Sequence, residues 1–269
     1  MAPGFSVTSR FPVFEKYAEA LAEVGVTTLL FDYRGFGMSE GDPRGEVNPW
    51  EQARDYRAAI KFLRSLTDVD ESRVGVWGVS TSCSVAGVVA ATDPLIAAVV
   101  LQVPAIGDAL SPADPDSSVF NAIRETVTTT DLASLDRTVV GPLPVVSADQ
   151  LNSPSFVTTI TAYRWFIENG ARFGTGWSNQ ATVARLSTTA PFDVQVCIPH
   201  IKAPLLMIVA HGDEENDADL SLAVFDTANE PKRLITVGGG HFGVLYPDTL
   251  EFEQSARAQQ AFLRKHLVV

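Results

Sequence analysis

The chain has few of the residues that build cross-linked or metal-bound proteins. Its 269 residues include two cysteines, Cys83 and Cys197, and four histidines. Two cysteines cannot form a disulfide framework, and the histidines do not have the spacing of zinc ligands. We therefore expect two unpaired thiols and no metal or organic cofactor.

Long apolar runs and an excess of positive charge are also missing. The longest apolar runs have the length of a strand, and no signal peptide opens the chain. Acidic residues outnumber basic ones by 32 to 20, which gives a net charge of −12. Such a charge disfavours binding to nucleic acid or to an anionic membrane surface. We expect a soluble cytoplasmic protein with neither of these partners.

Segments of two kinds alternate along most of the chain. The strand-like segments, apolar without alternation, are residues 26–32, 73–79, 95–103, 204–210 and 233–237. The segments with helical spacing of apolar residues are 11–25, 50–66, 83–92, 218–227 and 250–266. Strands buried on both faces and separated by helices predict an α/β fold, a mostly parallel sheet with helices on both faces.

Residues 105–200 interrupt this alternation. They are rich in Ser, Thr, Pro and Asp, and helices are predicted over residues 153–170, starting at the Ser153-Pro154 pair, and over residues 180–186. An insertion after a strand of a parallel sheet lies at the edge where ligands bind. We therefore predict a core of residues 1–104 and 201–269 with a mainly helical cap insertion, residues 105–200. The alternative is a surface elaboration without a role in substrate binding.

The segment around Ser80 predicts a sharp turn from a strand into a helix. Gly78 and Ser82 are small, so the strand and helix backbones can approach closely on both sides of Ser80. The turn would expose the hydroxyl at a helix N-terminus, whose amide N–H groups can stabilise an oxyanion. Ser80 is thus a candidate nucleophile, although a simple N-cap serine would give the same local pattern.

A serine nucleophile needs a base and an acid that orients this base. His241 follows the last predicted strand in a glycine-rich loop, and His211 is a weaker alternative. Asp213 is the first of four acidic residues after the strand at residues 204–210. Such a cluster is more often a solvated turn, but the chain order Ser80, Asp213, His241 favours a catalytic triad.

With these residues placed, the chain resembles the α/β-hydrolase superfamily. The segments that carry the resemblance are FDYRGFGMSEG at residues 31–41, GVSTS at 78–82, AHGD at 210–213 and GGGHFG at 238–243. The most similar branch contains dienelactone hydrolases, YcjY-type hydrolases and polyketide transferases. This branch often has a serine at the position of Ser82, whereas Cys83 and Ser84 replace two glycines.

The resemblance implies a catalytic triad with Ser80 as nucleophile, His241 as general base and Asp213 as the acid. It also implies an oxyanion hole formed by the backbone N–H groups of Thr81 and Phe5.

The family normally has three strands before the loop that begins this chain. One of them lies between the strands that correspond to residues 26–32 and 73–79, so its absence would leave a gap or exposed edges in the sheet. A truncated N-terminus, a shortened member stabilised by a partner chain and a fold that has lost catalysis are the three interpretations left open.

The resemblance predicts a serine hydrolase that cleaves a small ester, thioester or lactone through an acyl-enzyme on Ser80. The alternatives are an acyltransferase of the polyketide-transferase type and a non-catalytic binding module on the same fold. Trp165 and Trp177 in the predicted cap are candidates for contacts with an apolar acyl group, although such aromatics are more often cap core. We expect a small-molecule acyl substrate as partner, and exposed sheet edges leave a homodimer open.

Overall fold

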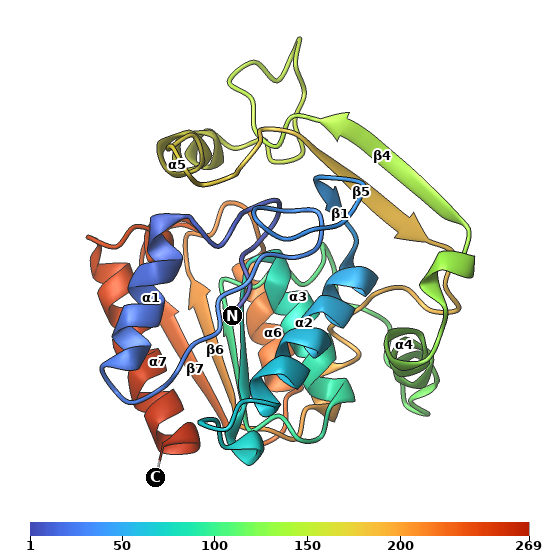
Figure 1. Ribbon diagram of the computed structural model, residues 1–269, viewed down its shortest axis with the longest axis vertical. Coiled ribbons are helices and arrows are strands. Elements are labelled where there is room, and N and C mark those ends of the chain that lie inside the picture. The colour runs from blue at the N-terminus through green and yellow to red at the C-terminus, as the bar shows by residue number, and fades with distance from the viewer. Residues whose placement is uncertain (269) are drawn as a thin grey trace.

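The computed structural model describes residues 1–268 and contains a parallel sheet at its centre (Figure 1). The four strands, in the order β2-β3-β6-β7, are all parallel. Their bounds are Gly75–Val79 for β2, Ala98–Gln102 for β3, Leu205–Ala210 for β6 and Lys232–Val237 for β7. All four carboxyl ends therefore lie at one edge, as the alternating sequence pattern predicts.

Helices cover both faces of this sheet. The helices that flank it are α1 Pro12–Ala22, α2 Pro49–Arg64, α3 Thr81–Thr92, α6 Ala218–Asp226 and α7 Leu250–Leu267. Helices α1 and α7 lie on one face, and α2, α3 and α6 lie on the other (Figure 1). Successive strand residues point into opposite cores: Val99 packs on the α2, α3 and α6 side, and Val100 packs on the α1 and α7 side.

Residues 105–200, which we call the cap, contain both helices and strands. Their elements are α4 Ser118–Thr128, β4 Arg137–Leu143, α5 Ile160–Gly170 and β5 Ala181–Leu186. Strand β5 pairs antiparallel with β4 and parallel with β1, Glu46–Val47, which belongs to the core segment before α2. The cap therefore contains, besides its helices, two strands that the sequence pattern did not predict.

Two helix predictions in the cap need correction. Where a helix was predicted over residues 180–186, Ala181–Leu186 forms strand β5. Thr182 and Val183 are β-branched and pair with β1, and Val183 also pairs with Val140 of β4. The helix predicted from Ser153 begins at Ile160, where the Thr159 side chain accepts the Ala162 N–H as an N-cap. The Ser153 N–H instead donates to the Asp149 carbonyl oxygen in a preceding turn.

Short 3₁₀ helices connect several of these elements. They are η1 Glu71–Arg73, η2 Leu132–Ser134, η3 Ile198–His200 and η4 Gly243–Leu245. Among the described residues, no helix combines the length and the apolarity that crossing a bilayer requires.

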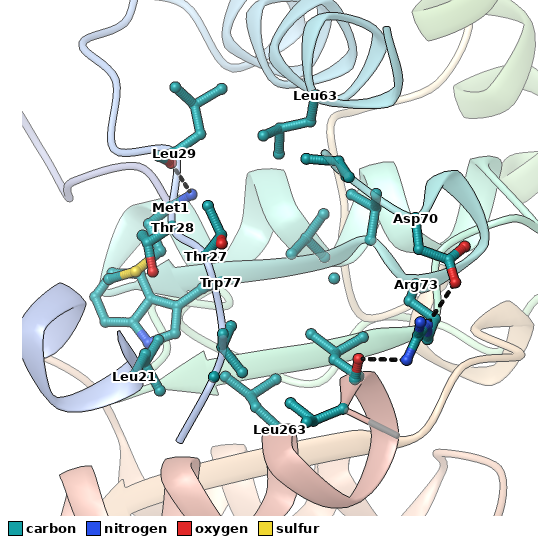
Figure 2. A pocket seen from close by; sticks show the side chains of 18 of the residues that line it. Met1, Leu21, Thr27, Thr28, Leu29, Leu63, Asp70, Arg73, Trp77 and Leu263 are labelled. Atoms are coloured by element: carbon teal, nitrogen blue, oxygen red, sulfur yellow. Dashed lines mark hydrogen bonds and ion pairs between the residues drawn. The ribbon is translucent and has the colours of Figure 1, made fainter. Parts of the chain in front are cut away.

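The strand predicted over residues 26–32 is not formed. Residues 26–33 have no regular secondary structure, and residues 26–31 are half-buried or exposed. A strand needs a hydrogen-bonded neighbour, and here Met1 supplies one at a single position, through Leu29 and Phe31. Between this segment and β2 lies a cavity of about 290 Å³ (Figure 2). Residues 26–32 therefore have the apolar sequence of a strand, but within residues 1–268 no strand pairs with them.

Candidate active site

Ser80 lies at a strained turn between β2 and α3. Its φ of 55° and ψ of −126° fall in a region that few non-glycine residues adopt. A Cβ on Gly78 would come within 2.5 Å of the Ser82 carbonyl oxygen, so only glycine fits there. Helix α3 starts at Thr81, and its first amide groups therefore follow directly after the Ser80 hydroxyl.

Ser82 holds this turn through its side chain. Its Oγ accepts the Val79 N–H at 2.7 Å and lies 2.9 Å from the Ala2 carbonyl oxygen. Ala2 in turn forms a parallel bridge with Gly78 of β2. Ser82 therefore fastens the first residues of the chain to the turn, which a glycine at this position could not do.

Cys83 and Ser84, the other unusual residues of this segment, are both tied to backbone. The Cys83 thiol is fully buried and donates to the Gln102 carbonyl oxygen at 3.3 Å. Burial raises the pKa of this thiol well above its usual value, so the reactive thiolate is disfavoured. The Ser84 hydroxyl donates to the Ala105 carbonyl oxygen.

Asp213 and His241 are joined by a buried contact. Nδ1 of His241 is 2.9 Å from Oδ2 of Asp213, and the two side chains are 3% and 4% exposed. Oδ1 of Asp213 accepts the backbone N–H groups of Glu215 and Asn216, each at 2.9 Å. These bonds fix the carboxylate, and a carboxylate that accepts from Nδ1 leaves Nε2 as the basic nitrogen.

The three acidic residues that follow Asp213 each form a hydrogen bond within the protein. Glu214 accepts the His241 backbone N–H at 3.0 Å, and Asp217 is the N-cap of α6. The Glu215 carboxylate accepts the Thr159 hydroxyl at the start of α5, and burial raises the pKa of this carboxyl. Sequence reasoning missed these separate roles, because a run of polar residues carries no signal for any one of them.

Ser80 and His241 line the same cavity, whose volume is about 250 Å³. Thr81 and Phe5, the predicted oxyanion donors, also line it. Most of the remaining wall is apolar. It comes from the N-terminal loop, α1, the cap and the segment after β7: Val7, Phe14, Phe156, Val157, Trp165, Phe166, Phe242 and Leu245. Within residues 1–268, Glu215 contributes the one carboxylate on this wall.

Gly4 allows the N-terminal loop to pass next to Ser80. A Cβ on Gly4 would lie 3.2 Å from both the Ser80 Cβ and the Val79 carbonyl oxygen, which is tighter than an ordinary contact. The next residue, Phe5, packs edge-to-face on Phe156 of the cap with the ring centroids 5.5 Å apart. The loop therefore touches the turn on one side and the cap on the other.

The two tryptophans predicted to contact substrate lie in different places. Trp165 lines the cavity, is 1% exposed and donates its indole N–H to the Leu245 carbonyl oxygen at 3.1 Å. Trp177 packs against Phe166 and Phe11, with ring centroids 5.6 Å and 6.2 Å away, and lines a different cavity. Its ring serves the packing of the cap on the core, because clustered aromatics bury a large area.

Comparisons with known proteins assign the chain to a family. The sequence profile of the Alpha/beta hydrolase family matches residues 1–251. The chain is 29% identical to thiohydrolase apmlB of Arthrinium phaeospermum, over 99% of this chain and 88% of that protein. It is 27% identical to polyketide transferase af380 of Aspergillus fumigatus, over 90% of this chain and 81% of that protein.

A solved structure shows the same fold. The alpha/beta hydrolase GrgF from Penicillium sp. sh18 superposes with a TM-score of 0.72 at 23% sequence identity, covering 100% of this chain and 89% of that one. Since the family profile also spans most of the sequence, this chain belongs to the alpha/beta hydrolase family.

Proposed function

We propose that this protein is a serine hydrolase that cleaves a thioester, ester or lactone of a small apolar acid. The observation that carries the proposal is the 2.9 Å contact between His241 and Asp213, on the cavity that Ser80 also lines. Relatives named thiohydrolase support the thioester among these substrates.

Each residue has one role in the proposed reaction. Ser80 Oγ attacks the carbonyl carbon while Nε2 of His241 takes its proton, and Asp213 stabilises the imidazolium that forms. The oxyanion accepts hydrogen bonds from the Thr81 and Phe5 N–H groups. The proton on His241 then passes to the leaving thiol or alcohol. Water, deprotonated by His241, releases the acid from the acyl-enzyme and Ser80 recovers its proton.

The cavity indicates the size of the acyl group. Its volume is about 250 Å³, and most of its wall is apolar. A small unbranched or aromatic acyl group would bury its apolar surface against this wall.

An acyltransferase is the second candidate, and Glu215 is the observation that favours it. Its carboxylate lies on the cavity wall, where it could accept a hydrogen bond from the hydroxyl or amine of an acceptor. A relative named polyketide transferase supports the same alternative. Transfer replaces only the last step, because the acceptor instead of water attacks the acyl-enzyme and gives its proton to His241.

The first experiment measures thiol release from an octanoyl thioester of a small thiol. Ser80→Ala should lower kcat on the order of 10⁶-fold, as loss of a nucleophile does. Ser84→Ala is the matched control. The Ser84 hydroxyl donates to a backbone carbonyl oxygen, so this variant should keep the activity of the wild type. A fluorophosphonate probe should label wild type and Ser84→Ala but not Ser80→Ala. Equal labelling of all three would refute Ser80 as the nucleophile.

Product analysis distinguishes hydrolysis from transfer. In the presence of a medium-length alcohol or amine, free octanoic acid indicates hydrolysis, and an octanoyl ester or amide indicates transfer. If Glu215 receives the acceptor, Glu215→Gln should lower the ratio of transfer to hydrolysis while thiol release continues.

A further inference from the structure

Asn216 contacts both members of the Asp213–His241 pair. Its backbone N–H donates to Oδ1 of Asp213 at 2.9 Å. Its side-chain amide lies beside the imidazole, with Nδ2 3.1 Å from Nδ1 of His241. Asn216 also lines the cavity that Ser80 lines. The loop that carries Asp213 therefore reaches the same ring nitrogen a second time, through a neutral side chain.

Nδ1 of His241 thus has two polar neighbours, although a ring nitrogen carries at most one proton. Oδ2 of Asp213 lies 2.9 Å away, and an ionised carboxylate can only accept hydrogen bonds. Nδ1 is therefore the protonated nitrogen and has no lone pair for an amide N–H. An amide N–H directed at it would bring two positively polarised hydrogens together. The contact with Asn216 is attractive only if the amide turns its oxygen toward the ring.

A half-turn of the Asn216 amide group meets this condition. The oxygen and the nitrogen of an asparagine amide exchange places in such a turn, so the hydrogen-bond partners decide which of them faces a neighbour. Within residues 1–268, His241 is the one hydrogen-bond partner of the Asn216 side chain, so the turn breaks no other bond. The Nδ1–H group would then be shared between Oδ2 of Asp213 and Oδ1 of Asn216 as a three-centre hydrogen bond.

A neutral second acceptor suits the surroundings of His241. The imidazole is 3% exposed, and the carboxylates of Asp213, Glu214 and Glu215 already lie near this residue. An amide oxygen adds negative potential at Nδ1 without a further charge among these carboxylates. It would stabilise the tautomer with an unprotonated Nε2, and also the imidazolium that forms when Nε2 takes the proton of Ser80.

We propose that Asn216 is a positioning residue for His241, whose side-chain oxygen accepts the Nδ1 proton together with Asp213 and so keeps Nε2 free to act as the base. This role rests on the proposed function, in which His241 takes the proton of Ser80. The hydrogen bond itself belongs to the resting protein and does not require the reaction. Spectroscopy can therefore test it separately from the reaction rate.

The kinetic test measures thiol release from the octanoyl thioester, on the pH plateau of each variant. Asn216→Leu has a similar size and no acceptor, so kcat should fall about 10- to 100-fold, the range of a hydrogen bond to a charged group. KM should stay close to that of the wild type, because the bond acts on the base. Asn216→Asp keeps an oxygen and removes the amide nitrogen, and it should retain most of kcat. The matched control is Asn121→Leu at an exposed position of α4, which should behave as the wild type.

The spectroscopic test measures the nitrogen-15 chemical shifts of the His241 ring in Ser80→Ala, where no turnover occurs. With Asn216 present, Nδ1 should be protonated and Nε2 unprotonated. Adding Asn216→Leu should raise the fraction of the tautomer with Nε2 protonated, whereas adding Asn216→Asp should not. If these shifts are found but the wild type releases no thiol, the proposed function fails and the hydrogen bond of Asn216 stands.

Two results would overturn the proposal for Asn216. The first is an Asn216→Leu variant with the kcat and the ring shifts of the parent protein. The second is an Asn216→Asp variant that loses as much kcat as Asn216→Leu, or that shifts the ring to the other tautomer, because the nitrogen end of the amide would then be the one that matters. If Asn216→Leu does not fold, Asn216→Asp alone decides, since it preserves the shape of the side chain.

Discussion

The carboxyl edge of the sheet and the outer side of β2 differ in how completely neighbouring segments hold them. At the carboxyl edge, Ser80, Asp213 and His241 follow β2, β6 and β7 on segments that several hydrogen bonds fix. Along its outer side, β2 faces a cavity and touches Ala2 at a single bridge. The candidate site is thus built from local turns that follow strands, whereas the sheet edge depends on a segment remote from those turns.

The largest expected effect concerns the well-held side. Asp213→Asn should lower kcat for thioester cleavage by about 10⁴-fold, because an amide in place of the carboxylate favours the wrong imidazole tautomer. Asp217→Asn is the matched control, since asparagine is an equally good N-cap for α6. Steady-state kinetics of both variants, with circular dichroism as a check on folding, measure the difference. Equal losses in the two variants would contradict the role of Asp213.

A smaller effect should appear where the two sides meet, at Ser82. Ser82→Ala removes the acceptor of the Val79 N–H and the contact to Ala2. A buried donor left without a partner costs about 1–3 kcal/mol in the free energy of unfolding, measured by urea denaturation. Amide exchange at Ala2 should also become faster.

The control for Ser82 is Ser65→Ala at the exposed end of α2. Its hydroxyl also donates to a backbone carbonyl, that of Phe62 at 2.7 Å, but exposed to water. The change should stay within about 0.5 kcal/mol, the usual range for a surface substitution. Equal destabilisation by the two alanines would show that Ser82 does not hold the turn to the first residues of the chain.

The smallest effect is a pH dependence at the wall of the Ser80 cavity. Burial raises the pKa of the Glu215 carboxyl above its ordinary value, so the folded state binds more protons than the unfolded state between these two values. The contribution of this carboxyl to the free energy of unfolding is therefore fully present below the ordinary glutamate pKa. It is lost as pH rises through the raised pKa of the folded state. In thermal unfolding, the Tm of Glu215→Gln should not show this loss as pH rises. The control Asp219→Asn, at an exposed position of α6, should retain it. Parallel stability curves for wild type and Glu215→Gln would exclude the effect.

The sequence predicts the parts of the fold whose cause is local. Gly78 and Ser82 identify the turn at Ser80. At Gly78 only glycine fits, because a Cβ there would lie 2.5 Å from the Ser82 carbonyl oxygen. The strands β2, β3, β6 and β7 follow from apolar segments that are flanked by helices. Family and fold can therefore be predicted from the order of the amino acids, and the assignment of Ser80, Asp213 and His241 as a catalytic triad stays a prediction.

What the sequence could not predict depends on contacts between distant segments. The pattern of residues 26–32 predicts a strand, but a strand forms only where a neighbouring backbone supplies hydrogen bonds. Residues 180–186 are too short for periodicity to distinguish a helix from a strand, and pairing with β1 and β4 decides for β5. Trp165 and Trp177 look equivalent in sequence. Of these two tryptophans, Trp165 lines the Ser80 cavity and Trp177 does not.

The pairing of β1 with β5 has a consequence for how the proposed substrate would exchange. Glu46 and Val47 of the core segment lie in register with Thr182 and Val183 of the cap, and the Thr182 N–H donates to the Gly45 carbonyl oxygen at 2.9 Å. Moving residues 105–200 away from the core as one unit would require breaking these main-chain hydrogen bonds. Under the proposed function, we therefore expect the substrate to exchange without such a movement. Turnover should become limited by passage through the mouth of the cavity for acyl chains longer than the cavity, instead of by a domain motion.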